Sequence, residues 1–341
     1  MNKKIVIACL VSLIILLLSG CGNNYLTEYD FGVIYTAEYK DKTQISFFDE
    51  KMEAVSSVSY HYPNISYNGF SNTLIVDNEL YISPKGHADK LDYGKIISLN
   101  LFDGKIKEYD FNRTNITNFA CDSRSLCISS NLNGKNYIDV YDMQTEKIQT
   151  MELEDVFVSS LVLQEDKIYG IMMDLETDSY SLCEFNVMED KYEILYELET
   201  ESDFMEIYQG KLYFACEDIL YEYNIQSKTL EKINLPHTNA YNLNLVGDML
   251  YIGCTDILNG TESYVDIMYL PDKKIVKSIK YEGIILQLEI SKEKNKLYIL
   301  DYDKLTVYDI SNEEAILVDS MALESANGYY IGGFYLNESK K

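Results

Sequence analysis

Acidic residues recur at a fixed distance from a repeated tyrosine. Four tyrosines flanked by apolar residues are followed, five positions later, by Asp174, Asp218, Asp256 and Asp303. Such carboxylates could form an acidic ring that attracts a cation or a cationic peptide, or could accept hydrogen bonds from turns that follow strands. Ligands of one calcium ion lie within about 2.6 Å of it, whereas packed sheets lie roughly 10 Å apart. We therefore expect mainly turn-stabilising roles and, beyond them, a diffuse acidic surface.

Three histidines could act as general bases or metal ligands. His61 and His237 lie in predicted connections between repeated units, and His87 follows a predicted strand. None of them belongs to a close pair such as H-E-x-x-H. With the four aspartates they are candidates for a ligand-binding face. The sequence indicates no catalytic residue, no metal site and no cofactor.

Five cysteines lie beyond the first 21 residues. Cys121 and Cys127 flank a predicted tight turn and could form a disulfide in an oxidising compartment. Cys183, Cys216 and Cys254 fall within predicted strands, where cysteine is usually a small buried hydrophobe. Because no C-x-x-C pair occurs, zinc-site and redox-motif interpretations have no support.

The N-terminus has the pattern of a secretory signal. Lys3 and Lys4 precede an apolar run over 5–18, which ends in Leu-Ser-Gly-Cys at Cys21. About fourteen apolar residues are fewer than the roughly 20 needed to span a bilayer, so a transmembrane anchor is less well supported. The last four residues resemble the lipobox of bacterial lipoproteins.

That resemblance implies that residues 1–20 are removed and that Cys21 carries the lipid. Two acyl chains are sufficient for stable anchoring, and residues 21–30 would be a tether spanning at most about 30 Å. The resemblance therefore implies a location at the cell membrane, on its extracytoplasmic side.

The charge of the chain excludes several functions. Without residues 1–20 the chain has 29 − 2 = 27 basic and 55 acidic residues, a net charge of 27 − 55 = −28. Such a protein repels phosphate, so unaided nucleic-acid binding is not expected. Only Arg113 and Arg124 are present, which excludes an arginine cluster that clamps several anions. With 47% hydrophobic residues, the chain can still bury a sizeable core.

One phrase, an apolar residue followed by Tyr and a further apolar or small residue, recurs along the chain. Its central positions, including a degenerate copy with Cys, are 35, 81, 127, 169, 213, 251 and 298, and their spacings lie between 38 and 47 residues. These are typical periods of propeller blades. Each copy has strand patterns before and after it, which predicts four strands per unit.

The first unit lacks its first strand, and an unpaired strand pattern occurs at the other end of the chain. Tyr329–Leu336 reads as a strand with a bend, and nothing after it completes a unit. We predict that this strand joins the first unit and closes the ring, which removes an open edge. The predicted domain covers 31–337.

The repeats resemble the YVTN or quinoprotein-like seven-bladed β-propeller family, most closely over 211–235 and 296–321. The resemblance implies an all-β ring of seven four-stranded antiparallel blades. Where that family can have Tyr-Val-Thr-Asn, this chain has variants such as Tyr-Ile-Ser-Pro from Tyr81. It also lacks tryptophan and an adjacent cysteine pair, so the resemblance carries over the fold and not a quinone cofactor.

These observations favour a membrane-anchored extracellular propeller that binds or scaffolds a protein, peptide or saccharide. Two alternatives remain open: a propeller-type hydrolase, lactonase-like or glycan-cleaving, and an envelope sensor. The 31 tyrosines are mostly expected in the core, since one side chain combines apolar area with a hydroxyl. The aromatic- and Asn-rich segments 59–70 and 236–242 are the predicted exceptions.

Overall fold

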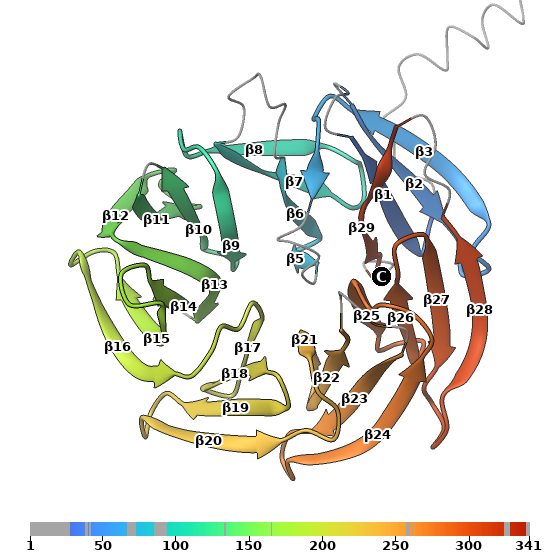
Figure 1. Cartoon of the computed structure of the whole chain (residues 1–341). Helices are drawn as coiled ribbons and strands as arrows, with labels where there is room; N and C mark the ends of the chain where they lie inside the picture. The colour runs from blue at the N-terminus through green and yellow to red at the C-terminus, as the bar shows by residue number, and fades with distance from the viewer. Residues whose placement is uncertain are drawn as a thin grey trace, which may run out of the picture.

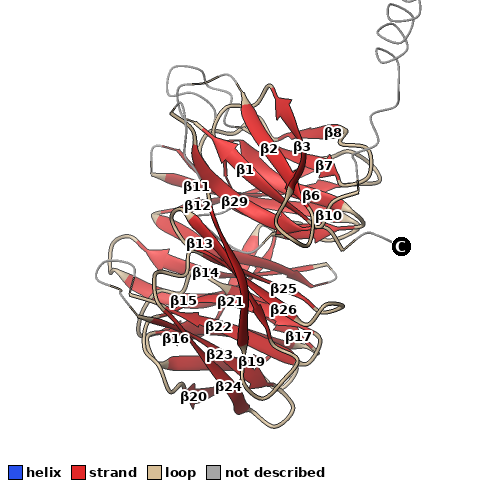
Figure 2. Cartoon of the chain, turned by 90° about the vertical axis from the view of Figure 1, so that its right-hand side faces the viewer, coloured by secondary structure: helices blue, strands red, loops and turns tan. Residues whose placement is uncertain are grey.

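The computed structural model describes residues 28–37, 40, 42–66, 73–84, 94–132, 134–164, 166–256, 260, 262–323 and 328–338. The predicted signal, Cys21 and His87 lie outside this part of the chain. Within it, the regular structure consists of strands, and no helix is present that is long and apolar enough to cross a membrane (Figure 2).

Seven antiparallel sheets are arranged around a ring, as predicted (Figure 1). Blade 1 contains β29 (Tyr330–Leu336), β1 (Phe31–Thr36), β2 (Thr43–Phe48) and β3 (Ala54–Tyr60). Blade 2 contains β4 (Ile65–Ser66), β5 (Leu74–Val76), β6 (Glu79–Pro84), β7 (Lys95–Asn100) and β8 (Ile106–Asp110). Blade 3 contains β9 (Ile116–Cys121), β10 (Ser125–Leu132), β11 (Lys135–Asp142) and β12 (Ile148–Glu154).

The other four blades have uninterrupted four-stranded sheets. Blade 4 contains β13 (Val156–Gln164), β14 (Lys167–Asp174), β15 (Ser179–Asn186) and β16 (Lys191–Leu198). Blade 5 contains β17 (Met205–Tyr208), β18 (Lys211–Cys216), β19 (Ile219–Asn224) and β20 (Thr229–Asn234). Blade 6 contains β21 (Ala240–Val246), β22 (Met249–Cys254), β23 (Ser263–Tyr269) and β24 (Lys274–Tyr281). Blade 7 contains β25 (Gln287–Ser291), β26 (Lys296–Leu300), β27 (Lys304–Asp309) and β28 (Ile316–Ala322).

The C-terminal strand closes the ring, which confirms the prediction. β29 pairs antiparallel with β1, with Phe31 opposite Leu336, and the register shifts between Ile34 and Tyr35. Figure 1 shows red β29 beside blue β1, although these strands come from opposite ends of the chain. A Cβ added to Gly332 at this bulge would lie 2.7 Å from the carbonyl oxygen of Ile65. Glycine therefore permits the close approach of β29 to β4 at the bend predicted from the sequence.

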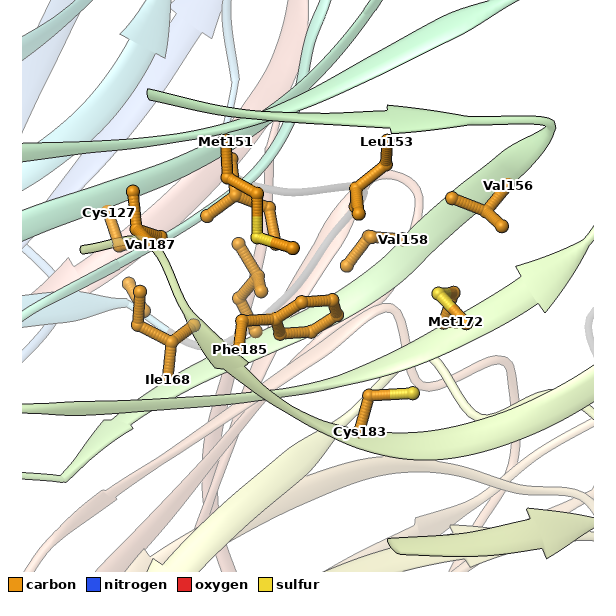
Figure 3. Close-up of a cluster of buried hydrophobic side chains, with 13 residues drawn as sticks. Cys127, Met151, Leu153, Val156, Val158, Ile168, Met172, Cys183, Phe185 and Val187 are labelled. Atoms are coloured by element: carbon orange, nitrogen blue, oxygen red, sulfur yellow. The ribbon is translucent and has the colours of Figure 1, made fainter. Parts of the chain in front are cut away.

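Apolar clusters fill the spaces between blades. In the cluster of Figure 3, Met151 and Leu153 of blade 3 face Phe185 and Met172 of blade 4, and all four side chains are buried. The tyrosines of the repeated phrase at 81, 169, 213, 251 and 298 are buried too, at 0 to 7% exposure, and Tyr35 of the degenerate first copy is half-buried. Packing therefore explains both the repeat and its period, because each central strand must be apolar on two faces.

The strand order gives the ring two different faces. Turns within each blade, such as 187–190 and 225–228, lie on one face, which we call the turn face. Loops between second and third strands, such as 175–178, and connections between blades, such as 199–204, lie on the other. We call this second face the loop face.

Candidate functional site

A cavity of about 380 Å³ lies within the ring of inner strands. Its walls come from β5, β9, β13, β17, β21 and β25, so six blades contribute to it. The polar and aromatic members of its lining are Thr73, Asn118, Phe119, Cys121, Ser160, Asp203, Phe204, Glu206, Asn244 and Glu289. A concave site with apolar walls and a few polar groups is the usual form of a small-ligand pocket.

Side-chain amides join neighbouring inner strands around this cavity. Asn244 donates to the carbonyl oxygen of Leu288 at 3.2 Å, and Asn118 donates to that of Ser159 at 2.7 Å. Gln287 makes two bonds with Phe334 of the closing strand: its Nε2 donates to the carbonyl oxygen at 2.8 Å, and its Oε1 accepts the N–H at 3.0 Å. These bonds satisfy backbone groups that an inner edge strand would otherwise leave unpaired.

Glu289 is the most deeply placed acid of the cavity, with 8% exposure. Its Oε1 accepts hydrogen bonds from the N–H and Oγ1 of Thr73, both at 2.8 Å, and from Nε2 of Gln287 at 3.0 Å. Thr73 precedes β5, so this carboxyl connects blade 7 with the inner strand of blade 2. Burial raises the pKa of Glu289 to about 7, although these donors oppose the shift.

More carboxyl groups lie toward the loop face. Asp203 and Phe204 line the central cavity and also an adjoining cavity of about 160 Å³, which includes Glu201 and Glu217. Asp203 is open to solvent yet surrounded by protein, and this partial desolvation raises its pKa. The pKa of Glu201 is raised by desolvation and then by the charge of Asp203. The adjoining cavity thus forms an acidic mouth.

The electrostatics of the central cavity restrict what it can hold. Among the described residues that line it there is no Lys, Arg or His, and its charged side chains are all carboxyls. Anionic phosphate groups are usually held by arginine, lysine or a row of backbone N–H groups. The lining therefore suits a neutral or positively charged ligand better than a phosphorylated one.

The six described residues of the predicted ligand face all lie on the loop face or next to it, as expected from the repeat. None of them lines the central cavity. Asp174 accepts backbone N–H groups of Glu176 and Thr177, each at 2.9 Å, which is the predicted turn-stabilising role. At Asp218 and Asp303 the hydrogen bond involves the backbone and not the carboxylate. The carbonyl oxygen of Asp218 accepts the N–H of Leu235, and that of Asp303 accepts the N–H of Leu323. Asp256 likewise accepts the N–H of Gly260 through its carbonyl oxygen, and His61 is exposed.

The ring of His237 is fixed by a hydrogen bond to a buried aspartate. Its Nδ1 lies 2.9 Å from Oδ1 of Asp266, which is fully buried, and its ring stacks on Tyr264 with centroids 3.6 Å apart. Ser278, opposite Asp266 in β24, donates to the same carboxylate at 2.5 Å.

Blade 3 contains the same arrangement with arginine in place of histidine. Arg113 donates to both oxygens of the fully buried Asp139, at 2.6 and 2.8 Å, and its guanidinium lies 4.0 Å from the ring centroid of Tyr137. Thr150 donates to Asp139, as Ser278 does to Asp266. Both units share the pattern [R/H]-T-N-x-x-N, which runs into the start of the inner strand, and Y-x-D in the third strand. That internal repeat is the sequence signal that could have revealed this pairing.

The structure contradicts the disulfide between Cys121 and Cys127. Both thiols are free. Cys121 is opposite Leu126 in the β9–β10 pair and Cys127 is opposite Ala120, so the two side chains point to opposite faces of the blade. Cys127 packs between blades 3 and 4 (Figure 3), whereas Cys121 packs on the side of blade 2 and lines the cavity. The register of the strand pair would have to shift by one residue to place Cys127 opposite Cys121.

The described residues contain no group of three or more His, Cys, Asp or Glu side chains that could hold a metal ion. The described parts of the aromatic segments singled out in the sequence do not line the central cavity either. Residues 67–70 lie outside the described chain, and the described part of 236–242 adds only Ala240 and Tyr241, at the mouth.

No protein-family model matches the chain, and no curated protein matches its sequence. Solved structures share its fold. A protein from Bacteroides uniformis, provisionally named 6-phosphogluconolactonase, is 11% identical with a TM-score of 0.60, over 91% of this chain and 100% of its own. A functionally unknown protein from Desulfotomaculum acetoxidans is 14% identical with a TM-score of 0.60, over 91% and 99%. The chain is a seven-bladed β-propeller. At these identities the likeness concerns the fold alone.

Replacing Glu289 by Gln should change how stability depends on pH. The folded-state pKa of about 7 lies above the ordinary glutamate value of 4.5, so the folded protein retains a proton that the unfolded chain loses. Stability should therefore fall as pH rises from about 4.5 to 7, by about 3 kcal/mol at most. Denaturant unfolding at pH 5 and pH 8 should show a smaller pH effect in Glu289→Gln.

Asp174→Asn provides the control, because the pKa of Asp174 is shifted in the opposite direction to that of Glu289. Backbone N–H groups lower the pKa of Asp174 below 3.8, so its contribution is present above that pH and is lost as pH falls. This variant should leave the difference between pH 5 and pH 8 unchanged. An unchanged pH effect in Glu289→Gln would contradict the assignment.

Arg113→Met should destabilise the fold by about 3–5 kcal/mol, because it leaves the fully buried Asp139 without its cation. The other arginine provides the control. Arg124 pairs with Asp166 at 3.5 Å and both side chains are exposed, so Arg124→Met should cost less than about 1 kcal/mol. Equal free energies of unfolding for the two variants would show that the buried pair is not needed.

Proposed function

We propose that this chain is a membrane-anchored extracytoplasmic lipoprotein whose propeller binds a ligand in its central cavity. The observation that carries the proposal is the cavity itself, formed by inner strands of six blades and lined by carboxyl groups as its only charged described side chains. The lipobox-like sequence ending at Cys21 supports the anchoring. The ligand that suits this lining is a small molecule or peptide end without net negative charge.

A hydrolase is the second candidate, because the structural neighbour from Bacteroides uniformis has a lactonase name. Two observations weigh against this candidate. The described lining offers no cation for a phosphorylated substrate, and the two described histidines, His61 and His237, are not among the cavity residues. Asp266 also occupies the Nδ1 atom of His237.

Anchoring is tested by fractionating cells that express the full chain or Cys21→Ser. The wild-type chain should remain with the membrane fraction, and the mature protein should carry the mass of a diacylglyceryl group. Cys21→Ser should be found outside that fraction. An unmodified Cys21 in the mature protein would contradict the anchoring.

Ligand binding is tested by thermal unfolding with four probes: spermidine, trilysine, diacetylchitobiose and 6-phosphogluconate. Cationic or neutral probes should raise Tm, and 6-phosphogluconate should not. Asp203→Asn should weaken binding of the cationic probes about tenfold, which corresponds to about 1.4 kcal/mol. Asp303→Asn, on the same face but outside the cavity, is the matched control and should bind as the wild type does. Hydrolysis of the lactone of 6-phosphogluconate, lost in Asp203→Asn, would instead support the hydrolase.

A further inference from the structure

The described chain begins and ends at the turn face. Asp30 precedes β1, donates its N–H to the carbonyl oxygen of Phe48 and accepts the N–H of Asn337, both at 2.8 Å. Lys294, in a turn of blade 7, forms an ion pair with Asp30. The segment that leads back toward Cys21 therefore leaves the propeller from this face, at blade 1.

The acidic mouth is at the opposite face. Glu201 and Asp203 lie in the connection between β16 and β17, and Glu217 lies in the loop between β18 and β19. Both of these are loop-face segments. The two features of the proposed function, anchor and ligand site, are thus separated by the thickness of the blades.

Chain length limits how the propeller can be oriented. From Cys21 to Glu28 there are 28 − 21 = 7 residue steps, which span about 25 Å at most. An eight-residue strand such as β15 is about 26 Å long. To bring the loop face to the bilayer, this segment would have to cover that length and also pass two outer strands of blade 1, about 10 Å more. It is too short to do so.

Charge favours the same orientation. The described loop-face segments are rich in carboxyl groups, which anionic lipid headgroups repel. The turn face has charges of both signs, and many of its lysines pair with neighbouring acids. Turn-face lysines, in or beside turns within blades, include Lys51, Lys105, Lys147, Lys167, Lys211 and Lys294.

We propose that the turn face is the membrane-facing surface of this protein and that the acidic mouth opens away from the bilayer. The proposal rests on the anchoring at Cys21 put forward above. A soluble ligand could then reach the cavity without approaching lipid. The partner of the turn face is the headgroup layer of the bilayer.

Single-tryptophan variants test this orientation, because the chain contains no tryptophan. Phe102→Trp places the probe on the turn face of blade 2, and Tyr302→Trp places it on the loop face of blade 7. Both parent residues are exposed, at 46% and 58%, and both blades flank blade 1. Leu317→Trp, at 57% exposure in the outermost strand β28, reports on an edge-on orientation.

The lipidated full chain of each variant is inserted into phosphatidylcholine–phosphatidylglycerol vesicles that contain a headgroup spin-labelled lipid. Fluorescence of Phe102→Trp should be quenched severalfold more than that of Tyr302→Trp or Leu317→Trp. Equal or stronger quenching at either of the latter two positions would overturn the orientation while leaving the anchor intact. Failure of the lipidated chain to float with the vesicles, as a Cys21→Ser control should fail, would overturn the anchor and the orientation together.

Discussion

Closure of the ring by β29 is the constraint on which the other features depend. A blade has an unpaired inner strand and two apolar faces, so each blade is stable only between two neighbours. Blade 1 obtains its inner strand from the far end of the chain, and Gln287 fixes the backbone of Phe334 through two hydrogen bonds. Because the last strand completes the first blade, the seven blades are held as one closed unit, and inner strands of six of them line the cavity.

The same closure sets the chemistry of the cavity. Amide side chains on inner strands form hydrogen bonds with neighbouring inner strands. Polar groups therefore face the centre of the ring, whereas apolar residues fill the spaces between blades. Glu289 shows that a carboxyl in this ring can be well hydrogen-bonded and still be disfavoured in its charged form. Its carboxyl has three donors on one oxygen and still has a raised pKa of about 7, because burial in the ring disfavours its charge. A binding site made in this way is pre-formed, since the contacts that stabilise the fold also position the polar groups.

The sequence predicts the seven units, their four strands and the closing strand, because tyrosine-centred strands recur at blade spacing. Asp174 could be predicted too, since a turn-stabilising role depends on local backbone. The cavity could not, because Glu289, Asp203 and Thr73 are distant in sequence and meet only around the ring. The Cys121–Cys127 disulfide was wrong because turn proximity says nothing about strand register. Arg113 and His237 share a sequence pattern that indicates one repeated structural pair.

Amide hydrogen exchange of the full chain measures the central claim most directly. If β29 closes the ring, those N–H groups of β29 that pair with β1, and that of Phe334 held by Gln287, should exchange only with global unfolding and as slowly as those of β1. Fast exchange of this segment in an otherwise protected protein would show a loose C-terminal tail. In that case blade 1 would have an open inner edge, and the cavity and the two faces described above would lose their basis.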